Sequence, residues 1–162
     1  MTQVRAASPD DAGEIVRLRA LMHHSMGSDG IAEQEWRDAA ARMLRRELAE
    51  PEPRIMVFVV DAGDAALAAC ATGTIQQRLP APGNPSGLVG YVSNVCTDVP
   101  YRRRGHARAC MLALMDWFAG RGVDRLDLRA SAEAEPMYTA LGFTRTTDPS
   151  MRMRLTTGTA RR

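Results

Sequence analysis

The stretch at residues 94–111, NVCTDVPYRRRGHARACM, decides the fold. Its first part is apolar, as in a strand, and a turn that contains proline follows. Three arginines and Gly105 then lead into a segment whose apolar residues have helical spacing. A glycine turn between a strand and a helix N-terminus directs backbone N–H groups outward, where they can hold an anion. The stretch therefore predicts an anion site that the rest of the chain frames.

The segments before this stretch predict two helices and a hairpin. Ser8 and Pro9 predict a helix start, because serine caps a helix and proline fits its first turn. The first helix runs to about residue 24, a break follows at residues 25–30, and a second helix covers residues 32–49. The apolar run at residues 54–61 predicts a strand covered on both faces.

The full order predicts a single mixed-sheet domain. It reads strand, two helices, three strands, helix, strand, short helix and strand, which is typical of an α+β domain rather than a doubly wound one. We expect the domain to span residues 1–156, with a tail at residues 157–162. The remaining strands are predicted at residues 3–7, 66–77, 88–99, 123–130 and 150–155, and the remaining helices at residues 105–121 and 135–141.

The overall charge and the cysteines narrow the class of protein. A formal net charge of +2 does not indicate a nucleic-acid partner, and the basic residues of YRRRGHAR are not interleaved with aromatic ones. No apolar run approaches the length of a membrane span, and the first residues lack the apolar part of a secretory signal. The three cysteines have neither disulfide nor metal-ligand spacing. We therefore expect a cytoplasmic protein with buried thiols and no metal.

Two motifs in this order resemble the GCN5-related N-acetyltransferases (GNAT). In the first, Arg102, Gly105 and Ala107 fill the pattern Arg-x-x-Gly-x-Ala between a strand and a helix. In the second, residues 128–143, LRASAEAEPMYTALGF, match a strand followed by a short helix that ends in Tyr-x-x-Leu-Gly-Phe. Many members have glycine where this chain has Arg103, and most have an aliphatic residue where it has His106.

The resemblance implies a fold and a co-substrate. The fold is the α+β GNAT fold, with a mixed, mostly antiparallel sheet of about six to seven strands, about four helices and a splayed strand pair at the cofactor site. The co-substrate is acetyl-coenzyme A, whose pantetheine arm would lie on the strand amides and whose pyrophosphate would lie on the basic turn. The cofactor-binding residues implied in this way are Val95, Cys96, Thr97, Arg102, Arg103, Arg104, Gly105, His106 and Ala107.

The resemblance also assigns a catalytic role to Tyr138. A phenol near the sulfur can protonate the thiolate that leaves during acyl transfer. The general base remains open among Asp98, His23, His24, Glu133 and Glu135, or a water molecule.

The acceptor is expected to be a small molecule whose primary amine attacks the acetyl group directly in a ternary complex. Its contacts should come from the variable segments at residues 22–36, 78–88 and 151–153, with Asn94 on the same side. The alternative is a domain that binds acyl-coenzyme A without catalysis, as a sensor. Homodimers are common in the family, so a homodimer is possible. We expect neither a nucleic-acid nor a membrane partner.

Overall fold

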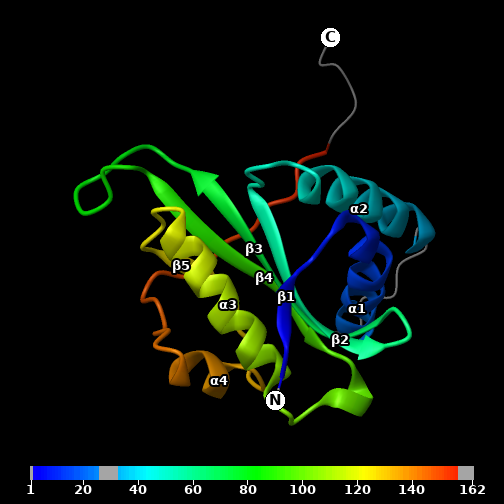
Figure 1. Ribbon diagram of the computed structural model, residues 1–162. Helices are drawn as coiled ribbons and strands as arrows, with labels where there is room; N and C mark the ends of the chain where they lie inside the picture. The colour runs from blue at the N-terminus through cyan, green and yellow to red at the C-terminus, as the bar shows by residue number, and fades with distance from the viewer. Residues whose placement is uncertain (1, 26–32, 157–162) are drawn as a thin grey trace. The chain divides into compact units, whose positions relative to one another are not determined.

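The structure is a computed structural model that describes residues 2–25 and 33–156 (Figure 1). The predicted break at residues 25–30, the acceptor segment at residues 22–36 and the tail at residues 157–162 therefore fall partly or wholly outside the described residues. The elements are β1 (Val4–Ala6), η1 (Pro9–Asp11), α1 (Ala12–Ser25), α2 (Glu33–Leu48), β2 (Ile55–Gly63), β3 (Ala66–Gln77), β4 (Leu88–Thr97), η2 (Val99–Tyr101), α3 (His106–Gly120), β5 (Leu126–Leu128) and α4 (Glu135–Ala140).

The chain divides into two compact units, Met1–Arg129 and Ala130–Arg162, and each is described by itself. The first unit contains the sheet and the helices α1, α2 and α3. The second contains α4 and the described residues that follow it. The expectation of a single domain over residues 1–156 stays a prediction.

The first unit is built on a five-stranded sheet in the order β1-β2-β3-β4-β5. The first four strands pair antiparallel, and β5 pairs parallel to β4. The predicted mixed, mostly antiparallel α+β fold with four helices is therefore confirmed. The predicted count of six to seven strands is wrong for the described residues. Residues 150–155 pair with no strand. Met151 and Met153, which alternate with arginines, are 89% and 78% exposed, so their side chains are not buried against a sheet.

Helices cover both faces of the sheet (Figure 1). On one face, Cys70 and Cys96 pack in a core with Ile15 and Leu18 of α1 and Leu44 of α2. On the other face, α3 lies so close that a Cβ on Gly73 would come within 2.6 Å of the Phe118 ring. The small residues of β3 thus allow α3 to approach the sheet. The predicted helix after the basic turn is confirmed, and its buried face consists of Cys110, Met111, Leu114 and Phe118.

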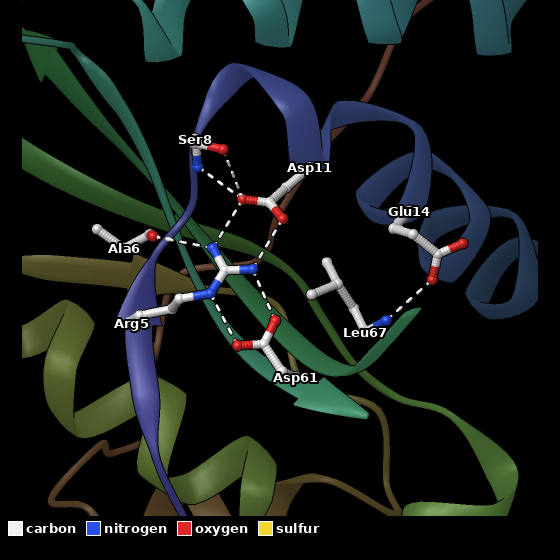
Figure 2. Close-up of polar contacts among 7 residues, drawn as sticks. All are labelled: Arg5, Ala6, Ser8, Asp11, Glu14, Asp61 and Leu67. Carbon is white, nitrogen blue, oxygen red and sulfur yellow. Dashed lines mark hydrogen bonds and ion pairs between the residues drawn. The ribbon is translucent and has the colours of Figure 1, made fainter. Parts of the chain in front are cut away.

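The start of the first helix is fixed by an arginine with two carboxylate partners (Figure 2). Ser8 is the N-cap and Pro9 the first residue of η1, as predicted, and the Ser8 amide donates to Asp11 Oδ2 at 2.7 Å. Arg5 of β1 donates to both oxygens of Asp11, at 2.8 and 2.9 Å, and to Asp61 of β2 at 2.6 and 2.8 Å. This network ties the edge strand to the helix start.

Asp11→Asn is expected to lower the free energy of unfolding at pH 7 by about 1–2 kcal/mol, because the paired charge is lost. The Arg5 guanidinium lowers the pKa of Asp11 to about 2. The stabilising effect of a lowered pKa is fully present above the unfolded value of about 4 and is lost as the pH falls toward the folded value. Urea unfolding between pH 7 and pH 3 should therefore show the two proteins converging. A difference that stays constant over that range, or an equal effect of the exposed control Asp10→Asn, would contradict this explanation.

Candidate active site

The central strand β4 contains a bulge at Asn94 and Val95. Cys70 of β3 lies opposite Cys96, but Thr72 lies opposite Ser93, so two residues of β4 face one residue of β3. Asn94 has φ 49°, in the left-handed region that asparagine tolerates better than most residues. An extra residue in this conformation bends the strand and interrupts its ladder.

Beyond the bulge, one edge of β4 is open. β5 pairs only with Gly90, Tyr91 and Val92, and in the described part of the chain no strand continues this pairing. The amide of Asp98 donates to Ala68 at 2.8 Å, so alternate residues back along β4 also face β3. By this alternation, the amide of Cys96 faces β3, whereas those of Val95 and Thr97 face the open edge. This divergence is the predicted splayed strand pair.

The turn after β4 presents a run of unpaired backbone donors. Arg103 has φ 64° and Gly105 has φ 79°, and α3 begins directly afterwards at His106. A left-handed residue followed by a right-handed one makes consecutive N–H groups converge on one point. Within the described residues, the amides of residues 103–108 donate no hydrogen bond. The turn therefore combines a concave group of donors with the positive end of the α3 dipole.

The backbone conformation at position 105 favours glycine. A Cβ there would have no protein atom within 4 Å, but φ of +79° is a conformation that other residues adopt only with strain. The motif glycine therefore shapes the turn itself.

The three arginines of the turn are exposed, so their charges are available to a ligand. Arg102 Nε donates to the carbonyl of Thr97 at 3.2 Å. Arg104 donates to the carbonyl of Pro100, and its guanidinium lies 5.6 Å from the centre of the Tyr101 ring. Two of the three side chains therefore also fold back on the turn and support its backbone.

His106, which the resemblance places among the cofactor-binding residues, contacts the first described residue. Its Nδ1 lies 3.1 Å from the hydroxyl of Thr2. His106 and Ala107 are both half-buried in the first turn of α3. The imidazole therefore joins the beginning of the chain to the helix start, and the motif did not predict this partner.

A clamp around Arg17 of α1 holds the beginning of the turn. Arg17 donates to Asp98 at 2.7 Å, to the carbonyl of Leu67 at 3.0 Å and to both oxygens of Glu14 at 2.9 Å. Glu14 accepts in turn from the Leu67 amide (Figure 2). The Arg17 guanidinium lowers the pKa of Glu14. Asp98 also caps η2 by accepting from Val99, so it is a structural residue of the turn.

Sequence reasoning missed Arg17, because its partner is 81 positions away and neither residue belongs to a motif. The same clamp makes Asp98 a poor candidate for the general base. Among the other candidates, His23 packs edge-on against Trp36 at 5.7 Å between ring centres, and burial lowers its pKa.

The second unit contains the predicted catalytic tyrosine. Tyr138 lies in α4, is 6% exposed and contacts the Phe143 ring edge-on at 5.9 Å. Burial raises the pKa of its phenol, so the group keeps its proton at neutral pH. Glu135 is ion-paired with Arg145, which lowers the pKa of the carboxyl group. In this unit the tyrosine is therefore suited to donate a proton, and Glu135 is already engaged.

Arg103→Gly is expected to raise the free energy of unfolding by about 1 kcal/mol, because glycine adopts φ of +64° without strain. The matched control is Arg102→Gly, at an ordinary φ of −64°, which should lower stability by up to about 0.5–1 kcal/mol. Both variants remove one exposed arginine from the same turn. Urea unfolding measures both effects. An equal change in the free energy of unfolding of the two variants would contradict the strain argument.

The donor groups of the first unit fit a long anionic ligand. Unpaired amides and arginines at the turn match a pyrophosphate, and the free amides of Val95 and Thr97 match an amide-containing arm that lies along β4. A mixed sheet that opens beside a bulged strand and continues into such a turn is the α+β architecture that the two sequence motifs implied. The chain belongs to the GNAT acetyltransferase family, whose family model matches residues 18–143. Acetyl-coenzyme A is the co-substrate of this family.

Solved structures show the same fold. A GCN5-related N-acetyltransferase from Ralstonia eutropha superposes with a TM-score of 0.80 at 26% identity, covering 94% of this chain and 99% of that one. A predicted acetyltransferase with acetyl-CoA from Clostridium acetobutylicum gives 0.80 at 21% identity, covering 94% and 96%. Glucosamine-6-phosphate N-acetyltransferase from Arabidopsis thaliana gives 0.69 at 15% identity, covering 98% and 99%. No curated protein matches the sequence. None of the described helices is both long and apolar enough to cross a membrane.

Proposed function

We propose that the protein is an N-acetyltransferase that moves an acetyl group from acetyl-coenzyme A to a primary amine of a small molecule. The observation that carries the proposal is the open edge of β4, which leads without a break into the anion-binding turn. Two kinds of donor thus follow one another along residues 95–108. An extended ligand with a polar arm and a pyrophosphate can use both.

In this proposal the turn and the strand bind different parts of the donor. Arg102, Arg103 and Arg104, with the amides of Gly105, His106 and Ala107, hold the pyrophosphate. Val95 and Thr97 offer their amides to the pantetheine arm and the thioester carbonyl, while Cys96 keeps the strand attached to β3. An N–H aimed at the oxygen on which negative charge develops contributes about 3–4 kcal/mol to such reactions.

The proposed reaction is a direct transfer in a ternary complex, with acetyl-coenzyme A supplying an activated acyl group. The neutral amine attacks the carbonyl carbon, so a C–N bond forms and the C–S bond breaks. We assign to the Tyr138 phenol the proton that the leaving thiolate takes up. This role requires residues 1–156 to act as one domain, as the order of elements in the sequence predicts. The attacking nitrogen releases one proton to water, and water returns a proton to the Tyr138 phenolate.

The test is an amine panel with acetyl-coenzyme A, in which free thiol is measured as it is released. We expect release that depends on the enzyme and on at least one primary amine of a small molecule. The panel should include amino sugars, polyamines and amino acid derivatives, with a short peptide and a tertiary amine as controls. If acetyl-coenzyme A raises the melting temperature but no amine causes release, the protein is a non-catalytic acyl-coenzyme A binding module instead.

A further inference from the structure

The bulge of β4 is held by a reciprocal contact between Asn94 and Cys70. The Cys70 thiol donates to the backbone carbonyl of Asn94, with Sγ and O 3.4 Å apart. The side-chain Nδ2 of Asn94 in turn donates to Cys70 Sγ at 3.6 Å. Cys70 is fully buried and Asn94 is 6% exposed. One side chain of β3 thus contacts both the main chain and the side chain at the bulge.

The two contacts are chemically consistent and fix the orientation of the Asn94 amide. Burial raises the pKa of Cys70 far above its usual value, so the thiol keeps its only hydrogen. That hydrogen is directed at the Asn94 carbonyl, which leaves only lone pairs on the sulfur for a second partner. The group that faces the sulfur must therefore be the NH₂ of Asn94. Its Oδ1 then faces away, buried and without a partner among the described residues.

The contact also sets the direction of the next amide. The described chain contains no cis peptide bond, so the C=O of Asn94 and the N–H of Val95 point in opposite directions. Since the carbonyl turns toward the Cys70 side chain, the Val95 N–H turns away from it. The ladder alternation independently places this N–H on the open edge of β4.

The arrangement is unfavourable for stability alone. Asn94 keeps a left-handed φ of +49°, which is less favourable than an extended conformation even for asparagine, and a buried oxygen without a partner loses its hydration. Thr72, in the adjacent strand, likewise has a buried hydroxyl oxygen without a partner among the described residues. Strained residues and unpaired buried groups of this kind cluster at functional sites, where the surrounding structure keeps them in place.

We propose that Cys70 and Asn94 are positioning residues for acyl transfer, and that their contact holds the Val95 N–H toward the thioester carbonyl of the donor. The proposal rests on the proposed function and concerns the alignment of one amide rather than affinity. Binding of the pyrophosphate uses the turn at residues 102–107. Loss of the contact should therefore reduce turnover without weakening the binding of acetyl-coenzyme A.

The test compares Cys70→Ala with Cys70→Ser, because serine retains a hydrogen that can be donated to the Asn94 carbonyl. In protein labelled with ¹⁵N-valine, with the Val95 signal assigned through Val95→Ile, acetyl-coenzyme A should shift the Val95 amide of the wild type and of Cys70→Ser. The shift should be lost or greatly reduced in Cys70→Ala. The kcat of Cys70→Ala should fall about tenfold or more, and that of Cys70→Ser should stay within about threefold. The Kd for acetyl-coenzyme A should stay within about threefold in both variants.

Cys110→Ala is the matched control, because Cys110 is an equally buried cysteine on α3. It should lose stability without changing the Val95 shift or kcat. Cys70→Val keeps the site filled with an apolar side chain that has no hydrogen to donate, so it provides a second variant should Cys70→Ala fail to fold, with the same expected loss of the Val95 shift. The proposal is overturned if acetyl-coenzyme A binds but leaves the Val95 amide of the wild type unshifted, or if Cys70→Ala retains the shift and kcat. A Val95 shift with no thiol release for any amine would instead refute the proposed function and leave the alignment of the amide supported.

Discussion

Tyr138→Phe is expected to lower kcat about a hundredfold or more, with little change in the Kd for acetyl-coenzyme A. The substitution removes only the hydroxyl, and the ring retains its edge-on packing against Phe143. Burial raises the pKa of the phenol, so at neutral pH the wild type has a proton to donate and phenylalanine has none. Stopped assays of thiol release, with calorimetric titration of acetyl-coenzyme A, measure the two quantities separately.

The control for this prediction is Tyr101→Phe, which removes a phenol from the turn of the first unit. It should leave kcat within about twofold, since no proton transfer is assigned to Tyr101. Unchanged turnover in Tyr138→Phe, at unchanged stability, would remove Tyr138 from the reaction. Another group would then have to protonate the leaving thiolate.

Gly105→Ala is expected to weaken the binding of acetyl-coenzyme A at least about tenfold, because alanine resists φ of +79° and the converging amides lose their alignment. Strain of about 1–2 kcal/mol per residue in this conformation should also lower the free energy of unfolding. Calorimetric titration and urea melts measure the two effects in the same samples.

The same helix offers a matched control for this prediction. Gly122 follows α3 and has φ of +74°, and a Cβ there also has no atom within 4 Å. Gly122→Ala should therefore lose a similar amount of stability but retain the affinity for acetyl-coenzyme A. Equal losses of affinity in the two variants would mean that Gly105 acts only through general stability.

The sequence predicted the parts of the fold that depend on local pattern. Ser8 and Pro9 mark the first helix start, and the spacing from Cys110 to Phe118 marks the buried face of α3, because caps and helical periodicity are properties of neighbouring residues. The prediction of a final strand at residues 150–155 was wrong, because a strand depends on elements that are distant in the sequence. Alternation predicts a strand only where another element covers one face.

The parts of the site that sequence could not predict depend on distant partners. The clamp from Arg17 to Asp98 and the contact from Cys70 to Asn94 join elements that meet only in the folded sheet. A bulge has no sequence pattern of its own, so the resemblance could imply that the Val95 amide binds the donor but could not show the contact that holds the bulge. The left-handed backbone angle of the motif glycine was likewise visible only in the structure.

The crystal structure of the protein with acetyl-coenzyme A tests the central claim most directly. We expect pyrophosphate oxygens about 3 Å from the amides of Gly105, His106 and Ala107, and the pantetheine arm along the open edge of β4. The thioester oxygen should lie at the same distance from the Val95 nitrogen. A pyrophosphate bound away from the turn, or a thioester oxygen with no contact to Val95, would contradict the account.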